Sequence, residues 1–282
     1  MKILETHIVP AINENIRLQE YASNIFRSIT TRNGVKKAIK RQEILLDGKI
    51  AQTSDWIKEH QKIDLLQSQT KAKKIFQLKL EVIFEDDFLA VINKPAGYPT
   101  SGNYFKTIEN SLPFNLKESA EFDALPYPVP VHRLDNPTSG LLLIAKTRTL
   151  QTTLHLEFEN RNIQKTYVAL VHGNASESFE ASDEIDGKLS HTQFLKLKHF
   201  ELQNSMYSLL EVHPDTGRTH QIRIHLAQHN VPIVGDKEHG IEETNRKFRG
   251  LYLASIGLNF QHPKTLKTLD LRLELPKKFN LS

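Results

Sequence analysis

The chain has 282 residues, of which 39% are hydrophobic and 25% charged, a composition typical of a globular protein with one large domain or a large and a small one. Its formal net charge is +4, and it contains no cysteine, which excludes disulfides and thiolate metal sites and fits a cytoplasmic protein. No apolar run approaches the roughly 20 residues that span a bilayer, and the first residues lack the apolar core of a secretory signal.

The positive charge is concentrated at the N-terminus. Residues 1–78 contain 14 Lys and Arg against 8 Asp and Glu, whereas the rest of the chain is close to neutral. A basic segment on a near-neutral body indicates a polyanionic partner, although a solvated helix face would explain the same charge.

Residues 1–70 predict a small module of helices and a hairpin. A helix from residue 16 to about 29 is predicted by four apolar residues at helical spacing: Leu18, Tyr21, Ile25 and Ile29. A second helix, capped by Thr31 or Asn33, is expected to run to about Arg41. Residues 44–50 predict a β-hairpin with an Asp-Gly turn.

The second helix carries a basic stripe, while Val35 and Ile39 point to its other side. The candidate RNA-binding residues on it are Arg32, Lys36, Lys37, Lys40 and Arg41. Two short helices and a hairpin with a basic face resemble the S-four-type RNA-binding domain, which is named after a ribosomal protein. That family usually has a glycine before the hairpin, where this chain has residues 41–43, Arg-Gln-Glu. A small helical cap without RNA contact is the alternative.

A polar, lysine-rich stretch at 67–78 predicts a linker, which we place at 71–78, before a larger domain at 79–282. Strands are predicted at 80–84, 88–93, 141–145, 164–172, 192–200 and 205–212. Helices are predicted at 150–161 and 218–229. Because strands and helices do not alternate regularly, the prediction is an α+β domain on a largely antiparallel sheet.

Asp135 and the residues around it say more about the function of this chain than any other segment. Asp135 is followed by a tight polar turn at 136–140 and by the buried strand at 141–145. A carboxylate on a stiff turn beside a core strand is held in place and partly desolvated, which suits catalysis. An aspartate that only caps the turn is the alternative.

Three segments in order resemble the RluA-type family of RNA pseudouridine synthases. They are the His-Arg-Leu-Asp segment with its turn at 131–147, the Lys-x-Tyr segment at 165–173, and the segment at 216–226 with its continuation at 232–236. Residues 93–97 match more weakly. The resemblance implies a pseudouridine synthase fold with a bent central sheet. It also implies isomerisation of uridine in RNA, without a metal or a redox cofactor.

The resemblance assigns roles to three candidate catalytic residues. Asp135 is the carboxylate that acts near the ribose, and Arg223 pairs with it and keeps it ionised. Tyr167 stacks on the uracil and helps to remove the C5 proton, although a strand tyrosine by itself would be core packing. We expect Arg223→Ala to cost activity with little loss of folding.

Substrate contacts are the next expectation. Arg133 is a candidate for extruding the nucleotide and contacting phosphates, with a surface ion pair as the alternative. Further candidate substrate contacts are His132, Lys94, Thr138, Arg218 and His220. For His220, a structural hydrogen bond is the alternative.

Two hydrolase classes fit the sequence poorly. His225 and His229 have the spacing of metal ligands, but Leu226 occupies the place of the required glutamate, and Asp236 and His239 would have to complete the site. We therefore expect surface or capping histidines and no metal site. A serine hydrolase lacks its Gly-x-Ser-x-Gly elbow around residue 139.

The expected partner is RNA, with no membrane and no small-molecule cofactor. The basic N-terminal module favours ribosomal RNA of the large subunit over transfer RNA. A non-catalytic RNA-binding or ribosome-assembly protein is the rival from another class, and the joint presence of Asp135, Tyr167 and Arg223 argues against it. The oligomeric state is left open.

Overall fold

The computed structural model describes residues 2–12, 15–29, 31–67, 74–241 and 248–280. The chain forms two compact units. One comprises residues 1–73 with 119–126 and 147–149, and the other comprises 74–118, 127–146 and 150–282. Residues 71–73 of the expected linker lie outside the described residues, and the boundaries at 70 and 79 stay predictions.

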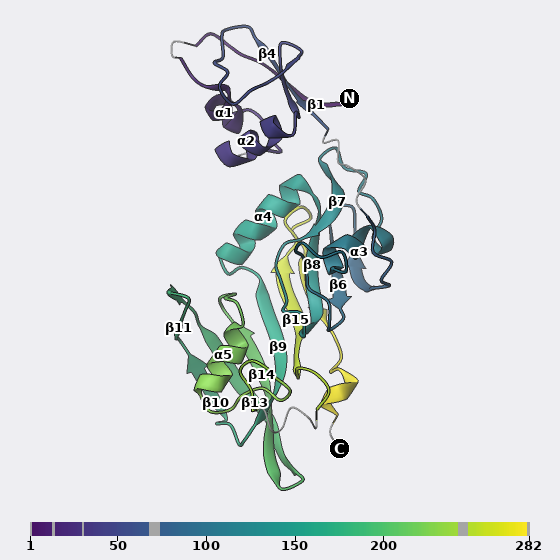
Figure 1. Cartoon of the computed structure of the whole chain (residues 1–282), viewed down its shortest axis with the longest axis vertical. Helices are drawn as coiled ribbons and strands as arrows, with labels where there is room; N and C mark the ends of the chain where they lie inside the picture. Colours follow the sequence, from purple (N-terminus) through teal and green to yellow (C-terminus); the bar gives the residue numbers. More distant parts are fainter. Residues whose placement is uncertain (1, 13–14, 30, 68–73, 242–247, 281–282) are drawn as a thin grey trace. The chain divides into compact units, whose positions relative to one another are not determined.

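The N-terminal unit contains a four-stranded sheet in the order β1-β4-β2-β3 (Figure 1). Its elements are β1 (Ile3–Ile8), α1 (Leu18–Tyr21), η1 (Ala22–Asn24), α2 (Arg32–Lys40), β2 (Ile44–Leu46), β3 (Lys49–Ile50) and β4 (Lys62–Leu66). Thr31 caps α2 by accepting a hydrogen bond from the Gly34 backbone N–H, as expected. Asp47 and Gly48 both have positive φ in the predicted hairpin turn.

The predicted helix at 16–29 is wrong in length. Four residues of α1 pass into the 3₁₀ turn η1, and no helix continues to residue 29. The Ser23 hydroxyl donates to the Glu20 carbonyl, a local bond that competes with helix propagation. The apolar pattern nevertheless identified core positions, because Leu18 and Ile29 are buried.

The larger unit contains a ten-stranded sheet (Figure 1). Its strands are β5 (Glu81–Glu85), β6 (Leu89–Lys94), β7 (Ala124–Pro130), β8 (Ser139–Thr147), β9 (Gln164–His172), β10 (Ser178–Ala181), β13 (Thr192–Leu202), β14 (Ser205–Pro214), β15 (Leu253–Gln261) and β16 (Thr268–Arg272). The short pair β11 (Glu184–Ile185) and β12 (Lys188–Leu189) forms a separate hairpin. The helices are α3 (Ile108–Asn115), α4 (Arg148–Glu159), α5 (Gln221–Gln228) and η2 (Lys277–Phe279).

The strand order β10-β13-β14-β9-β15-β8-β6-β5 places β9 and β15 in the middle of the sheet. In this sheet β8 pairs with β15 in parallel, whereas the pairs β10–β13, β13–β14, β14–β9, β9–β15, β15–β16, β8–β6 and β6–β5 are antiparallel. The predicted α+β class with a largely antiparallel sheet is therefore confirmed. The expected strand at 164–172 coincides with β9, and α4 and α5 lie within three residues of their predicted starts and ends.

A close approach of two backbones fixes where β8 enters the sheet. Gly140 has a φ of +119°, and a Cβ atom there would lie 2.0 Å from the Ser255 carbonyl oxygen on β15. Any other residue would push these strands apart. The loop that carries Asp135 ends at this junction, so the parallel pairing of β8 and β15 determines where the loop lies.

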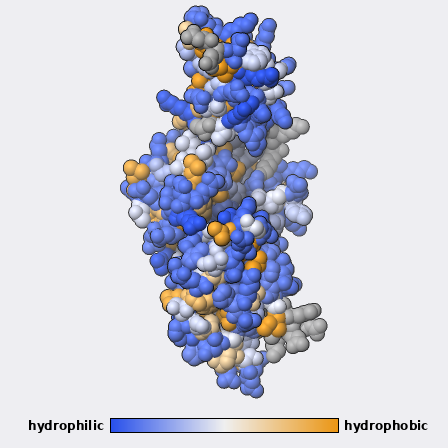
Figure 2. All heavy atoms as spheres, turned by 90° about the vertical axis from the view of Figure 1, so that its left-hand side faces the viewer, coloured by the Kyte–Doolittle hydropathy of each residue, from blue (hydrophilic) through white to orange (hydrophobic). Residues whose placement is uncertain are grey.

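The strands β6, β8 and β9 are almost entirely buried, as their apolar sequences predict. Hydrophilic side chains cover most of the face in Figure 2, and the hydrophobic ones on it form separate groups. Among the residues that the structure describes, no helix is both long enough and apolar enough to cross a membrane.

Candidate active site

Lys94, at the end of β6, anchors the loop that carries Asp135. Its ammonium group is fully buried and donates to four backbone carbonyls: Pro95, Asp135 and Asn136, each at 3.2 Å, and Thr138 at 2.7 Å. This is a different role from the phosphate contact predicted for Lys94, because its donors are used within the protein. The lysine positions the backbone on both sides of the Asp135 side chain.

Burial lowers the pKa of Lys94 to about 8, although the charge of Asp135 opposes the shift. Above that pH the unfolded chain, with its ordinary lysine pKa, binds more protons than the native one, so stability attributable to Lys94 rises between pH 8 and about 10.5. We expect the free energy of unfolding of wild type, measured against Lys94→Met in urea, to gain at most about 3 kcal/mol from pH 7.5 to 10. A pH-independent difference between the two proteins would contradict this.

Arg223, on α5, holds two carboxylates in the larger unit. Its Nε and Nη2 each donate to Asp236 at 2.7 Å, Nη2 also donates to Glu238 at 3.1 Å, and Nη1 lies 3.5 Å from Asp135 Oδ2. The Arg223 side chain is only 2% exposed. Although burial raises the pKa of Asp236, hydrogen bonds from Arg223 and from the Glu238 and His239 backbone outweigh it and lower that pKa. The predicted proximity of Arg223 to Asp135 is present.

His220 approaches Asp135 from the start of α5. Its Nε2 lies 4.0 Å from Asp135 Oδ2, and its Nδ1 lies 3.1 Å from Nε2 of His239. The residue has a φ of +55°, a left-handed conformation that costs a non-glycine residue on the order of 1 kcal/mol. In this conformation the imidazole lies near the carboxylate. Sequence reasoning had not placed His239 in this site.

Tyr167 lies on β9, directly opposite Val212 of β14 and Ser255 of β15. It is 8% exposed. Burial raises its pKa well above the ordinary value, the neighbouring Ser255 hydroxyl acts in the opposite direction, and the charge of Asp135 adds to the rise. The phenol is therefore neutral at pH 7 and presents an aromatic surface with a hydroxyl.

These side chains meet in one pocket of about 440 Å³, a size that ligand sites commonly have. Of the predicted site residues, its walls include His132, Arg133, Asp135, Thr138, Tyr167, Arg218, His220 and Arg223, but not Lys94. Phe158, Arg161 and Lys165 also line it and were missed, because nothing in the helix and strand patterns distinguishes them from packing or solvated residues. Burial lowers the pKa of Lys165 to about 8.

The His132 side chain lines the pocket, but contacts within the protein fix its imidazole in place. Its Nε2 accepts a hydrogen bond from the Leu143 backbone N–H at 2.9 Å, and its ring lies 4.7 Å from that of Phe158. Burial, aided by the charge of Lys165, lowers the pKa of His132 to about 3, so the imidazole is neutral. Thr138 is buried, and its hydroxyl has no hydrogen-bond partner among the described residues.

The comparison with known proteins agrees with this geometry. Residues 88–228 match the model of the RNA pseudouridylate synthase family. A ribosomal large subunit pseudouridine synthase C from Yersinia pestis is 34% identical, over 86% of this chain and 78% of that protein. The chain belongs to the RNA pseudouridylate synthase family. A ribosomal large subunit pseudouridine synthase D from Xanthomonas campestris is 32% identical, over 84% of this chain and 75% of its own length.

A solved structure shows the same fold. Human RNA pseudouridylate synthase domain containing 1 superposes on this synthase with a TM-score of 0.59 at 20% identity, covering 74% of this chain and 86% of that one. The family match and the two curated relatives confirm the resemblance found in the sequence motifs, and the chain is an RNA pseudouridine synthase, an isomerase. The alternative of a non-catalytic RNA-binding or ribosome-assembly protein loses its support.

The two histidines that suggested a metal hydrolase make hydrogen-bond contacts within this synthase. His225 is fully buried, with Nε2 beside the Ser190 hydroxyl at 2.8 Å and Nδ1 beside the Thr192 hydroxyl at 3.0 Å. His229 contacts the His225 carbonyl through Nδ1 at 3.0 Å. His229 is the capping histidine that we expected, whereas His225 is a core residue.

The basic residues predicted on α2 fall into two groups. Arg32 pairs with Glu20 at 2.9 Å, and Arg41 forms two hydrogen bonds to Glu43, at 2.6 and 2.7 Å. The second group consists of the three lysines on this helix, Lys36, Lys37 and Lys40.

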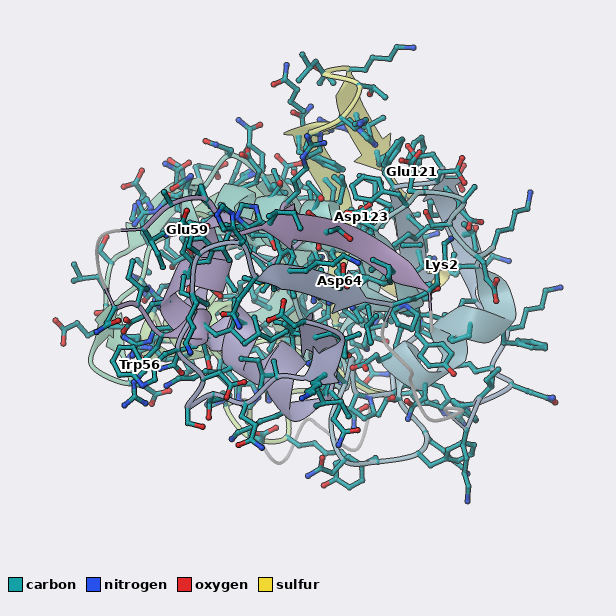
Figure 3. The ribbon with its side chains drawn as sticks, turned by 90° about the horizontal axis from the view of Figure 1, so that it is seen from above. Lys2, Trp56, Glu59, Asp64, Glu121 and Asp123 are labelled. Carbon is teal, nitrogen blue, oxygen red and sulfur yellow. The ribbon has the colours of Figure 1, made fainter. Side chains whose placement is uncertain are left out.

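An aromatic residue that sequence reasoning missed lies in the same unit. Trp56 is 50% exposed and has the Arg17 guanidinium 5.0 Å above its ring. In Figure 3 Trp56 projects outward, away from the strand that carries Asp64. Exposed aromatic and arginine side chains of this kind are those on which unpaired bases stack.

Loss of the Tyr167 hydroxyl tests its chemical role in the synthase. Phenylalanine keeps the aromatic surface, so we expect Tyr167→Phe to bind RNA normally but to lower turnover by about 10² to 10⁴, the range of proton-transfer catalysis. Turnover and KM for substrate RNA should be measured separately. Full turnover in the variant would exclude Tyr167 from proton transfer and leave it only as a stacking platform.

Proposed function

We propose that this synthase isomerises specific uridines in the ribosomal RNA of the large subunit, with Asp135 as the catalytic carboxylate. The observation that carries this proposal is the convergence of Asp135, Tyr167 and Arg223 in one pocket. The relatives named for the ribosomal large subunit support that choice of RNA.

The geometry supports the following sequence of events. Arg133, exposed at the pocket, assists extrusion of the uridine, whose base then stacks on Tyr167. Asp135, kept near Arg223, acts at the sugar as nucleophile or base, and the N1–C1′ bond breaks. The detached uracil rotates within the pocket and C5 bonds to C1′. This displaces Asp135 from C1′ where it acted as the nucleophile, and where it acted as a base the sugar regains its proton from Asp135. The C5 proton leaves with the help of the Tyr167 hydroxyl, and N1 takes up a proton, so that product and substrate are isomers.

The N-terminal unit is proposed to hold the RNA while the larger unit modifies it. Lys36, Lys37 and Lys40 supply positive charge on one helix, and Trp56 with Arg17 supplies a stacking surface. Both features favour a structured RNA with unpaired bases.

The proposed substrate is tested by release of tritium from C5-tritiated uridine in unmodified RNA. Wild-type protein is incubated in parallel with ribosomal RNA of the large subunit and with transfer RNA. We expect release from the ribosomal RNA and little from the transfer RNA. The reverse result would overturn the proposed target, and mapping of the modified positions would identify the uridines.

The role of α2 is tested by charge removal in the full chain. Replacing Lys36, Lys37 and Lys40 together by glutamine should weaken RNA binding and reduce the slope of log K against log salt by about 2, as expected for three lost phosphate contacts. Lys267→Gln, an exposed lysine of the larger unit, is the control for general charge effects. An unchanged affinity and salt slope in the triple variant would favour the helical cap without RNA contact.

A further inference from the structure

Three side chains with metal-binding atoms converge at the edge of the catalytic pocket. His220 Nδ1 lies 3.1 Å from His239 Nε2 and 3.4 Å from Glu238 Oε2, and the three atoms all lie within 4.8 Å of one another. A proton on one imidazole nitrogen can bond well to only one of the other two atoms. A cation among them would bind all three.

Two of the three separations fit a zinc ion, and the donor atoms favour zinc over a hard cation. Zinc holds nitrogen and oxygen ligands at about 2.0–2.2 Å in a tetrahedron, which sets neighbouring ligand atoms about 3.3 Å apart. The separations of 3.1 and 3.4 Å lie on either side of that value. Two imidazoles and one carboxylate favour zinc over magnesium or calcium, which prefer oxygen ligands alone.

The surroundings favour a cation. Three carboxylates, those of Asp135, Asp236 and Glu238, surround the single guanidinium of Arg223.

The ligands are also held by their neighbours. Asp236 Oδ1 accepts hydrogen bonds from the backbone N–H groups of Glu238 and His239, at 3.0 and 3.1 Å, which fixes the turn that carries both side chains. Glu238 Oε1 accepts a hydrogen bond from Arg223, and Glu238 Oε2 faces His220. Supporting contacts of this kind orient the ligands in metal sites.

We propose that His220, Glu238 and His239 form a zinc-binding site with one open position, and that zinc bound there inhibits the synthase. A metal on His220 Nδ1 leaves the proton of that ring on Nε2, which faces Asp135 Oδ2 at 4.0 Å. The metal-bound histidine then points its N–H toward Asp135, and the ion lies against the pocket that receives the uridine. The inhibitory part rests on the proposed catalytic role of Asp135, whereas the binding part does not.

Binding is tested without any activity assay. Cobalt(II), which replaces zinc in tetrahedral sites and gives them a visible absorption band, is titrated into the full-length protein free of any histidine tag, and zinc is then added to displace it. We expect one tight site per chain, with affinity lowered about tenfold or more in His239→Ala. His199→Ala, a solvent-exposed histidine of β13, should leave it unchanged. Absence of a saturable band, or equal binding by His239→Ala, would overturn the site.

Inhibition is tested by tritium release during a zinc titration. We expect turnover to fall at the zinc concentrations that displace cobalt, to recover with a chelator, and to resist zinc in His239→Ala, each variant being compared with its own zinc-free rate. Zinc bound to the RNA itself would inhibit both proteins equally and would overturn the inhibitory role. A protein inactive on every RNA without zinc would instead contradict the proposed function, and the cobalt titration alone would then decide the site.

Discussion

Replacing Asp135 by asparagine is expected to abolish tritium release, with turnover reduced by about 10³-fold or more. Asparagine keeps the shape of the side chain but can act neither as a nucleophile nor as a base. The loop itself should persist, because Lys94 and Thr138 hold it through the backbone of residue 135 and not through its carboxylate. The thermal midpoint and RNA affinity of Asp135→Asn should therefore stay close to those of wild type.

Asp87→Asn is the matched control, because it makes the same change at an exposed turn outside the pocket. It should retain wild-type turnover. Measurable turnover by Asp135→Asn within tenfold of wild type would remove Asp135 from the chemical step. A folded but inactive variant that binds RNA would place the defect in that step.

Arg223→Ala is expected to destabilise the protein by about 3–5 kcal/mol as well as to inactivate it. The substitution would leave the fully buried Asp236 without the guanidinium that donates two hydrogen bonds to it. This departs from the sequence-based expectation of little loss of folding, which assumed that Arg223 served Asp135 alone. Urea denaturation of both proteins measures the difference.

Arg223→Lys separates the two effects. A lysine retains a positive charge beside Asp236 but not the paired donors of the guanidinium, so we expect a smaller loss of stability and still a large loss of turnover. An alanine variant as stable as wild type would show that the buried pair with Asp236 contributes nothing to folding.

Local sequence patterns were sufficient to predict much of the fold. Residues 164–172 form a strand as predicted, and α2 begins after the expected Thr31 cap, because alternation, periodicity and capping are properties of neighbouring residues. The helix predicted at 16–29 failed because Ser23 offers the backbone a competing bond and because the apolar residues beyond it reach the core without helical geometry. The strands β1 and β4, which pair across most of the N-terminal unit, were missed because each is short and depends on a distant partner.

The site was predictable as a set of motifs and not as a set of contacts. Sequence motifs identified Asp135, Tyr167 and Arg223, and the structure brings all three to one pocket. Three of the four carbonyl partners of Lys94 lie more than forty positions away, and no side-chain pattern reveals such acceptors. The contact between His220 and His239 depends in the same way on the turn that Asp236 organises.

The junction of Gly140 with Ser255 has a consequence for the order in which the enzyme becomes competent. The strand that follows the Asp135 loop packs in parallel against β15, which belongs to a far later part of the chain. Closing such a distant pairing is entropically costly and slow compared with forming a hairpin. A growing chain that has made Asp135, Tyr167 and Arg223 but not β15 therefore lacks the surface on which the Asp135 loop rests. We therefore expect isomerase competence only after β15 has been synthesised and has joined the central sheet.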